Sequence, residues 1–188
     1  PIVLILLLSA IQANIPVELF EIGHLTPGIT VFGLSFMALF TAQVVAKDRA
    51  SSFLTRLFTT PMKSHNFILG YMLPLVVMSV IQVALCLFAA LFLGLDFTIT
   101  IFAVILILIP MALIYIGIGL ICGTLFSEKA AVGICGALLT NLSAWLSGVW
   151  FDLELVGGFF KEIANVLPFV HAVELGKAVL NGHYEDMF

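Results

Sequence analysis

Few residues in this sequence have the type and spacing that metal binding or acid–base chemistry requires. His171 and Glu174 lie three positions apart, a spacing that places two ligands on one face of a helix. A protein zinc site needs at least a third ligand, and none accompanies this pair. The sequence therefore favours a solvated polar stripe here, and no metal is predicted.

The sequence also lacks the residues that proton relay, ATP hydrolysis and intramembrane catalysis require. The long uncharged runs contain no acidic or basic side chain that could relay protons. The sequence has no GxxxxGK[ST] phosphate loop, so the chain does not hydrolyse ATP through a P-loop of its own. It also has no HExxH motif and no Ser/His or Asp/Asp pair within a run. We expect no catalytic residue and no cofactor on this chain.

Basic residues gather in the stretch KDRASSFLTRLFTTP at 47–61, which holds three of the seven Lys and Arg residues. Ser51 or Ser52 could supply an N-cap, and Thr60-Pro61 ends the helix. A short amphipathic helix is predicted, which either anchors the loop to anionic headgroups or docks a partner protein. Its apolar residues recur at helical spacing and are Phe53, Leu54, Leu57 and Phe58.

The elements that position these residues are predicted to be membrane-spanning helices. Of the 188 residues, 62% are hydrophobic and 10% charged, and the mean hydropathy is +1.24, far above that of a soluble domain. Barrel strands would alternate polar and apolar residues, so the fold is predicted to be an all-α polytopic bundle. Pro1 to about Ala13 is a partial run, read as the outer end of a helix. Four uncharged runs reach the roughly 20 residues that a span needs, from Gly28 to Ala46, Phe67 to Leu95, Phe97 to Ser127 and Ala130 to Phe151.

Charge is divided unequally between the loops at the two ends of these helices. Spanning helices alternate sides, so the loops form two sets. Five of the seven basic residues fall in the set that contains 47–61, and nine of the eleven acidic residues fall in the other. An excess of Lys and Arg marks the cytoplasmic side. The stretch 47–61 is therefore predicted to be cytoplasmic, and the segment 152–188 external.

The external segment 152–188 is predicted to form two short helices. The first runs from Gly157 to Leu167 and the second from Phe169 to Leu180, ending near Gly182. The second is predicted to be an amphipathic helix at the outer membrane surface. Its polar stripe consists of His171, Glu174, Lys177 and Asn181.

The order of several short motifs resembles the membrane subunit of type-2 ABC exporters. Asp48-Arg49 followed by LTRLFTTP resembles the family's loop after the second helix, with Ser52 where the family usually has glycine and Thr55 where it has glutamate. LTPG at 25–28, ILGY at 68–71, LSGVWF at 146–151 and LPFVHAV at 167–173 resemble further family motifs in the family order.

The resemblance implies six helices in the full chain, so the start of the first helix and a whole sixth helix are expected outside 1–188, which is read as one transmembrane domain fragment. It implies that 47–61 is a coupling helix for a separate ABC ATPase subunit that holds ATP and magnesium. It also implies an external re-entrant motif containing Pro168, His171 and Glu174. The implied coupling residues are Asp48, Arg49, Phe53, Leu54, Arg56, Leu57, Phe58, Thr60 and Pro61.

The resemblance further implies a transport pathway between two permease copies, identical or different, lined by the second and fifth helices. Lipid-facing and packing roles stay open for each candidate residue. The absence of charge in the runs favours an apolar or amphipathic cargo, such as a drug or a lipid-linked molecule. The candidate pathway residues are Phe32, Phe36, Gln43, Asn141, Ser143 and Trp145.

The predicted function is thus the permease subunit of an ATP-driven exporter in a bacterial-type inner membrane, with an ATPase subunit, a second permease copy and membrane lipid as partners and no nucleic acid. A non-transporting scaffold or immunity protein is one alternative, and an intramembrane enzyme is another. The GxxxG spacing of Gly119 and Gly123 also has two interpretations, packing within one subunit or a dimer contact.

Overall fold

The structure, a computed structural model, describes residues 1–14, 22–61, 63–95, 100–146 and 168–181. Helices make up nearly all of this part and it contains no β-strand, which confirms the all-α prediction. The elements in chain order are α1 (Ile2–Asn14), α2 (Ile22–Ala50), α3 (Phe53–Phe58), α4 (Ser64–Phe92), α5 (Thr100–Leu125), α6 (Glu128–Val132), η2 (Gly133–Leu139), α7 (Thr140–Leu146) and α10 (Pro168–Asn181).

Three of these helices are long and apolar enough to cross a membrane. Their spanning parts contain 26 residues in α2, 29 in α4 and 25 in α5. At about 1.5 Å per residue, each exceeds the roughly 30 Å thickness of the hydrocarbon core. The first three predicted runs correspond to α2, α4 and α5, in that order. The fourth run corresponds to the consecutive elements α6, η2 and α7.

The sequence predicted one regular spanning helix for the last of these runs, but the structure shows an irregular one. Its middle part, η2, is a π-helix of seven residues. The hydroxyl of Thr140 donates to the carbonyl oxygen of Cys135, five residues earlier, at 2.9 Å. Hydropathy does not distinguish an α-helix from a π-helix, because both bury an apolar run equally well. The wider turn changes which side chains of α7 share a face with those of α6.

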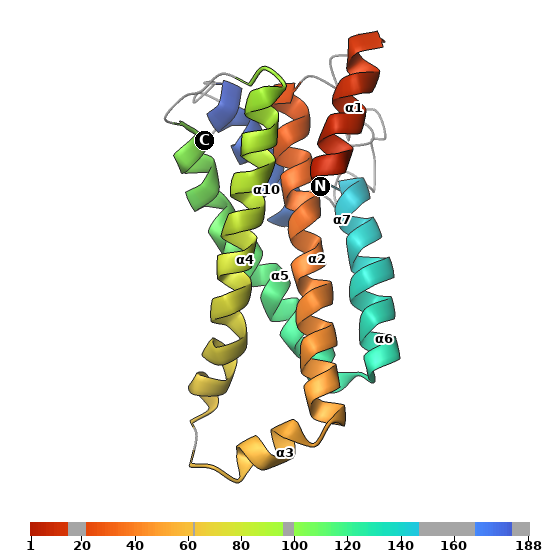
Figure 1. Cartoon of the computed structure of the whole chain (residues 1–188), viewed down its shortest axis with the longest axis vertical. Coiled ribbons are helices and arrows are strands. Elements are labelled where there is room, and N and C mark those ends of the chain that lie inside the picture. Colours follow the sequence, from red (N-terminus) through yellow and green to blue (C-terminus); the bar gives the residue numbers. More distant parts are fainter. Residues whose placement is uncertain (15–21, 62, 96–99, 147–167, 182–188) are drawn as a thin grey trace.

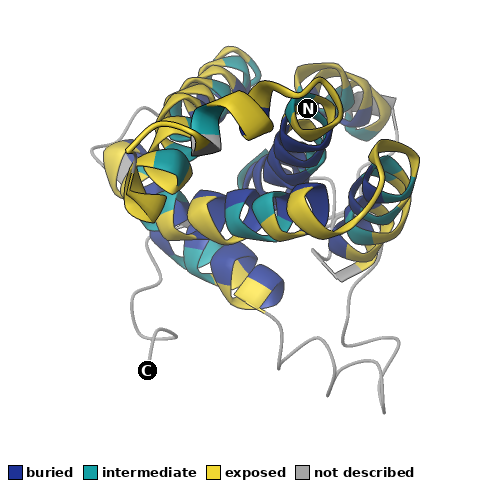
Figure 2. Cartoon of the chain, turned by 90° about the horizontal axis from the view of Figure 1, so that it is seen from below, coloured by how far each residue is buried: buried dark blue, intermediate teal, exposed yellow. Residues whose placement is uncertain are grey.

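Helix α2 lies at the centre of the bundle, where it contacts α4, α5, α10 and all three elements of the last run. Figure 1 shows α2, α4 and α5 running along the long axis, with α3 and the turn between α5 and α6 at one end and α1 and α10 in the opposite half. Figure 2 shows the buried residues on the inner faces of the helices and the exposed residues on the outside. That exterior is apolar, with Phe102 63% and Leu106 69% exposed, as expected of side chains that face lipid.

Small residues bring α2 and α5 into close contact. A Cβ atom added at Gly119 would lie 2.6 Å from the Cβ of Thr41, and one added at Gly123 would lie 2.8 Å from the Cβ of Val45. Both distances are far below ordinary van der Waals contact. The GxxxG spacing therefore serves packing within one chain, the first of its two interpretations.

Helix α10 differs in placement from the surface helix that the sequence predicted. It contacts α2 and α5, and Gly176 allows this approach, because a Cβ there would lie 2.8 Å from the Cβ of Pro27. The apolar side of α10 is thus covered by protein. The residues on this buried side are Phe169, Val170, Ala172, Val173 and Val179. The other predicted external helix, 157–167, lies outside the described residues.

Candidate functional site

The predicted amphipathic helix is present as α3, but it is shorter than the stretch 47–61. Residues 47–50 form the last turn of α2, and α3 begins only at Phe53 and ends at Phe58. Lys47 and Arg49 in that last turn place positive charge at the negative end of the α2 dipole. Two of the three basic residues of the stretch therefore belong to α2, whereas Arg56 and the apolar residues belong to α3.

The turn between α2 and α3 depends on the backbone of Ser52. Its φ of 60° and ψ of 5° lie in the left-handed region, and its side chain makes no capping hydrogen bond. The hydroxyl of Ser51 donates instead to the carbonyl oxygen of Asp48 at 3.0 Å. Ser52 thus occupies the N-cap position, as predicted, but its side chain does not cap the helix. A left-handed conformation suits glycine, the residue that the exporter resemblance expects at position 52.

One side of α3 is anchored and the other is free for contact. Leu54 is only 5% exposed, whereas Phe53 is 49% exposed, and Thr55 and Arg56 are exposed too. Leu57 is half-buried. The exposed surface thus combines a large aromatic side chain with a cation at the end of the bundle, a composition that suits a protein partner. Among the other predicted coupling residues, Thr60 and Pro61 are exposed, and the side chain of Phe58 is outside the described part.

The side chain of Arg49 forms hydrogen bonds with another helix of its own chain. Its guanidinium donates through Nη1 to the carbonyl oxygen of Thr124 and through Nη2 to that of Phe126. Thr124 lies in the last turn of α5 and Phe126 directly follows α5, where carbonyl groups lack helical partners. A planar guanidinium fork can satisfy two such acceptors at once.

Asp48, the neighbouring residue, connects to a different helix. Its Oδ2 accepts a hydrogen bond from the hydroxyl of Tyr71 at 2.6 Å, and Tyr71 lies two turns into α4. The adjacent residues Asp48 and Arg49 therefore link the end of α2 to both α4 and α5.

The candidate pathway residues fall into two groups. Phe32 and Phe36 of α2 are partly exposed and make an edge-to-face contact with ring centroids 5.4 Å apart. Asn141 is exposed and donates to the carbonyl oxygen of Ala137 at 2.6 Å. Trp145 is 52% exposed. Gln43 belongs to the same partly exposed group.

Ser143 forms the second group by itself. It is fully buried, and its Oγ accepts a hydrogen bond from the hydroxyl of Tyr115 at 2.8 Å. The Tyr115 ring stacks on Phe169 of α10, with centroids 5.1 Å apart and planes 11° apart. Ser143 thus has a packing role that joins α7 to α5. Tyr115 was not predicted as a site residue, although a polar residue within so apolar a run was a usable signal.

The external motif offers little chemistry. His171 Nδ1 lies 3.7 Å from Glu174 Oε2, and their side chains are 56% and 62% exposed. Pro168 is the first residue of α10, a position where its missing N–H costs nothing. No cluster of three or more His, Cys, Asp or Glu that could hold a metal occurs among the described residues.

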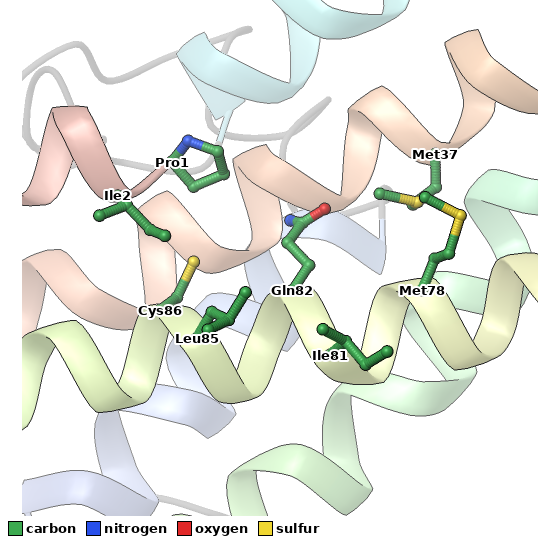
Figure 3. A pocket seen from close by; sticks show the side chains of 8 residues that line it. All are labelled: Pro1, Ile2, Met37, Met78, Ile81, Gln82, Leu85 and Cys86. Atoms are coloured by element: carbon green, nitrogen blue, oxygen red, sulfur yellow. The ribbon is translucent and has the colours of Figure 1, made fainter.

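A cavity of about 280 Å³ lies between α1, α2 and α4 (Figure 3). The amide nitrogen of Gln82 is buried beside it without a hydrogen-bond partner. The other walls are apolar and would fit a hydrocarbon chain rather than a charged ligand. The lining of the cavity consists of Pro1, Ile2, Met37, Met78, Ile81, Gln82, Leu85 and Cys86.

Comparison with known proteins identifies the family of this chain. No curated protein and no solved structure matches the chain. A family model described as "ABC-2 family transporter protein" matches residues 2–187. This match covers nearly the whole chain and includes both the α3 region and the segment 152–187. The chain therefore belongs to the ABC-2 family of transporter proteins and is the membrane permease component of an ABC transporter.

Proposed function

We propose that this permease exports an apolar or amphipathic molecule, using ATP hydrolysed by a separate ABC ATPase subunit that docks on α3. Membership of the family implies an ATPase partner. The observation that carries the choice of surface is the geometry of α3, where Leu54 is buried while Phe53 and Arg56 remain exposed. This surface and the α5–α6 turn lie at the same end of the bundle (Figure 1). That end carries the excess of basic residues.

Docking is tested by co-expressing the permease with a candidate P-loop ATPase and measuring how much ATPase co-purifies. F53A/R56E is expected to reduce this amount at least tenfold, because it removes the aromatic contact and reverses the charge. Lys63→Glu is the matched control, since Lys63 is exposed in the same loop but lies outside α3. Undiminished co-purification with F53A/R56E would exclude α3 as the docking site.

The pathway is proposed to lie between two permease copies, on the exposed side of α2 and α7. In support of this placement, Trp145 and Asn141 are exposed in a part of the chain where Ser143 is covered. Oxidation of Trp145→Cys in membranes is expected to give a disulfide-linked dimer. Phe102→Cys is the control, because Phe102 is 63% exposed on α5. Equal cross-linking of the two variants would contradict the proposed dimer.

The cargo is proposed to be uncharged over much of its surface. Along the proposed pathway, no side chain of α2 between residues 28 and 46 or of α7 between residues 140 and 146 is charged, so a charged cargo would lack a counter-ion there. The test is ATP hydrolysis by the reconstituted complex in the presence of drug-like and lipid-linked compounds. Stimulation by small hydrophilic ions alone would overturn this assignment.

A further inference from the structure

The inner end of α2 carries two neighbouring residues whose side chains bond to different helices. Asp48 accepts from Tyr71 of α4, and Arg49 donates to the carbonyl oxygens of Thr124 and Phe126 at the end of α5. Among the residues that the structure describes, these three helices are the ones long and apolar enough to span a membrane. The pair therefore joins all three at one point, which we call the inner joint, defined by Asp48, Arg49, Tyr71, Thr124 and Phe126.

The inner joint is close in the chain to the proposed docking surface. Only Ser51 and Ser52 separate the last residue of α2 from Phe53, the first residue of α3. Helical backbone hydrogen bonds flank this turn on both sides. Ser51 N donates to the Lys47 carbonyl oxygen, and Arg56 N donates to the Ser52 carbonyl oxygen. Burial of Leu54 holds α3 against the bundle. A displacement of α3 is thus transmitted to the joint through a short, hydrogen-bonded connection.

The α5 side of the joint leads directly to the last helical run. Phe126 is followed by Ser127, whose Oγ accepts a hydrogen bond from the backbone N–H of Ala130 at 3.4 Å and so caps α6. Arg49 holds the carbonyl groups on the α5 side of this cap. The guanidinium therefore fixes the turn from which α6, η2 and α7 continue, including the exposed Asn141 and Trp145.

We propose that Arg49 and Asp48 are positioning residues that transmit movement of α3 to α5, α6 and α4, and that Arg49 binds the permease's own α5 end instead of the ATPase. This inference rests on the proposed docking function of α3. It changes the role of Arg49, which the resemblance had grouped with the docking residues. The docking surface is then limited to α3, and the joint behind it converts docking-site motion into bundle motion.

The test measures two spin-label distances in the permease, alone and with its ATPase. One pair joins Thr55→Cys on α3 to Glu128→Cys at the start of α6, and the other joins Thr55→Cys to Leu69→Cys on α4. All three label positions, Thr55, Glu128 and Leu69, are exposed. Cys86, Cys122 and Cys135 are buried and are replaced by alanine where they react with the label.

Each substitution is expected to affect one distance only. Arg49→Gln should broaden the distribution for the pair on α3 and α6, because an amide cannot reach both carbonyl oxygens, and should leave the pair on α3 and α4 unchanged. Tyr71→Phe should do the reverse. Arg49→Lys should give partial rescue of the first pair, since one ammonium group can replace one of the two contacts. Arg49→Gln and Tyr71→Phe should each retain ATPase co-purification within about twofold of the unsubstituted chain.

Three results would overturn the proposal. Loss of ATPase binding in Arg49→Gln would make Arg49 a docking residue. Unchanged distance distributions in both variants would remove the mechanical role. Equal broadening of both pairs by either variant would indicate general loosening of the fold. The distances in the permease alone test the joint even if no ATPase binds, so failure of the joint and failure of the proposed docking function give different results.

Discussion

Single residues in the turn and core carry identifiable energetic costs and gains. Ser52 adopts a left-handed backbone, which costs an L-residue about 1–2 kcal/mol relative to glycine, and no capping bond offsets this cost. Among the described residues, it is the one non-glycine residue with positive φ. Tyr115 represents the opposite case, because its buried hydroxyl donates a hydrogen bond to Ser143.

Ser52→Gly is expected to raise the free energy of unfolding by about 0.5–1 kcal/mol, the relief of backbone strain minus the greater entropy of glycine in the unfolded chain. Thermal unfolding in one detergent provides the measurement. Ser51→Gly is the control and should lower stability, because it removes the hydrogen bond to the Asp48 carbonyl. A decrease of similar size in both variants would contradict the assigned role of Ser52.

Tyr115→Phe and Ser143→Ala are expected to be coupled. Each removes the same buried hydrogen bond, so the double variant should cost less than the sum of the single variants, by about 0.6–1.7 kcal/mol. The stack on Phe169 is retained in phenylalanine. Tyr115→Phe combined with Ser51→Ala should be additive, since these sites lie on different elements. Additivity in the Tyr115–Ser143 cycle would show that the bond contributes no stability.

At the scale of helices, the fold depends on how closely α2 approaches α5. Transmembrane helices lack a hydrophobic driving force for association within lipid, so close packing of small residues supplies much of the attraction. Ala38 and Ala42 of α2 face Gly119 and Gly123 of α5. Both alanines are fully buried. The contact therefore has little room for added atoms.

Gly119→Ala is expected to destabilise the protein by about 1–3 kcal/mol, because the new methyl group would press on α2. Gly117→Ala is a matched control two residues away, with nothing within 4 Å of the added atom. It should be neutral or stabilise by about 0.5–1 kcal/mol through helix propensity. Unfolding curves of the two variants give the comparison, and equal stability of the two would exclude the tight contact.

At the scale of the whole molecule, the two ends of the bundle differ in what they present. One end carries α3, the inner joint and the α5–α6 turn, and α10 lies in the other half, packed on α2 and α5 (Figure 1). Helices α2, α4 and α5 are long enough to cross a membrane, so the two ends of the bundle are expected on opposite sides of it. A chemical label that cannot cross the bilayer therefore distinguishes the two ends.

A membrane-impermeant maleimide is expected to label His171→Cys in intact cells and Thr55→Cys only after permeabilisation. The expectation follows from the excess of Lys and Arg at the α3 end. Background labelling should be low, because Cys86, Cys122 and Cys135 are buried. Labelling of Thr55→Cys in intact cells would reverse the proposed orientation and with it the docking site.

Composition and local spacing were sufficient to predict the spanning helices, the amphipathic spacing of α3 and the helix α10. The family was predicted from the resemblance of several short motifs. These features depend on residues close together in the chain, where hydropathy and periodicity act directly. The contacts of Arg49 span 75 and 77 residues, and the Tyr115–Ser143 bond spans 28. The left-handed turn at Ser52 and the π-helix η2 are also set by how the chain must pack, because local propensity favours neither. Spacing therefore predicted the amphipathic stretch within 47–61, and tertiary packing separated the residues that face outward, such as Phe53, from those that bind the bundle, such as Arg49.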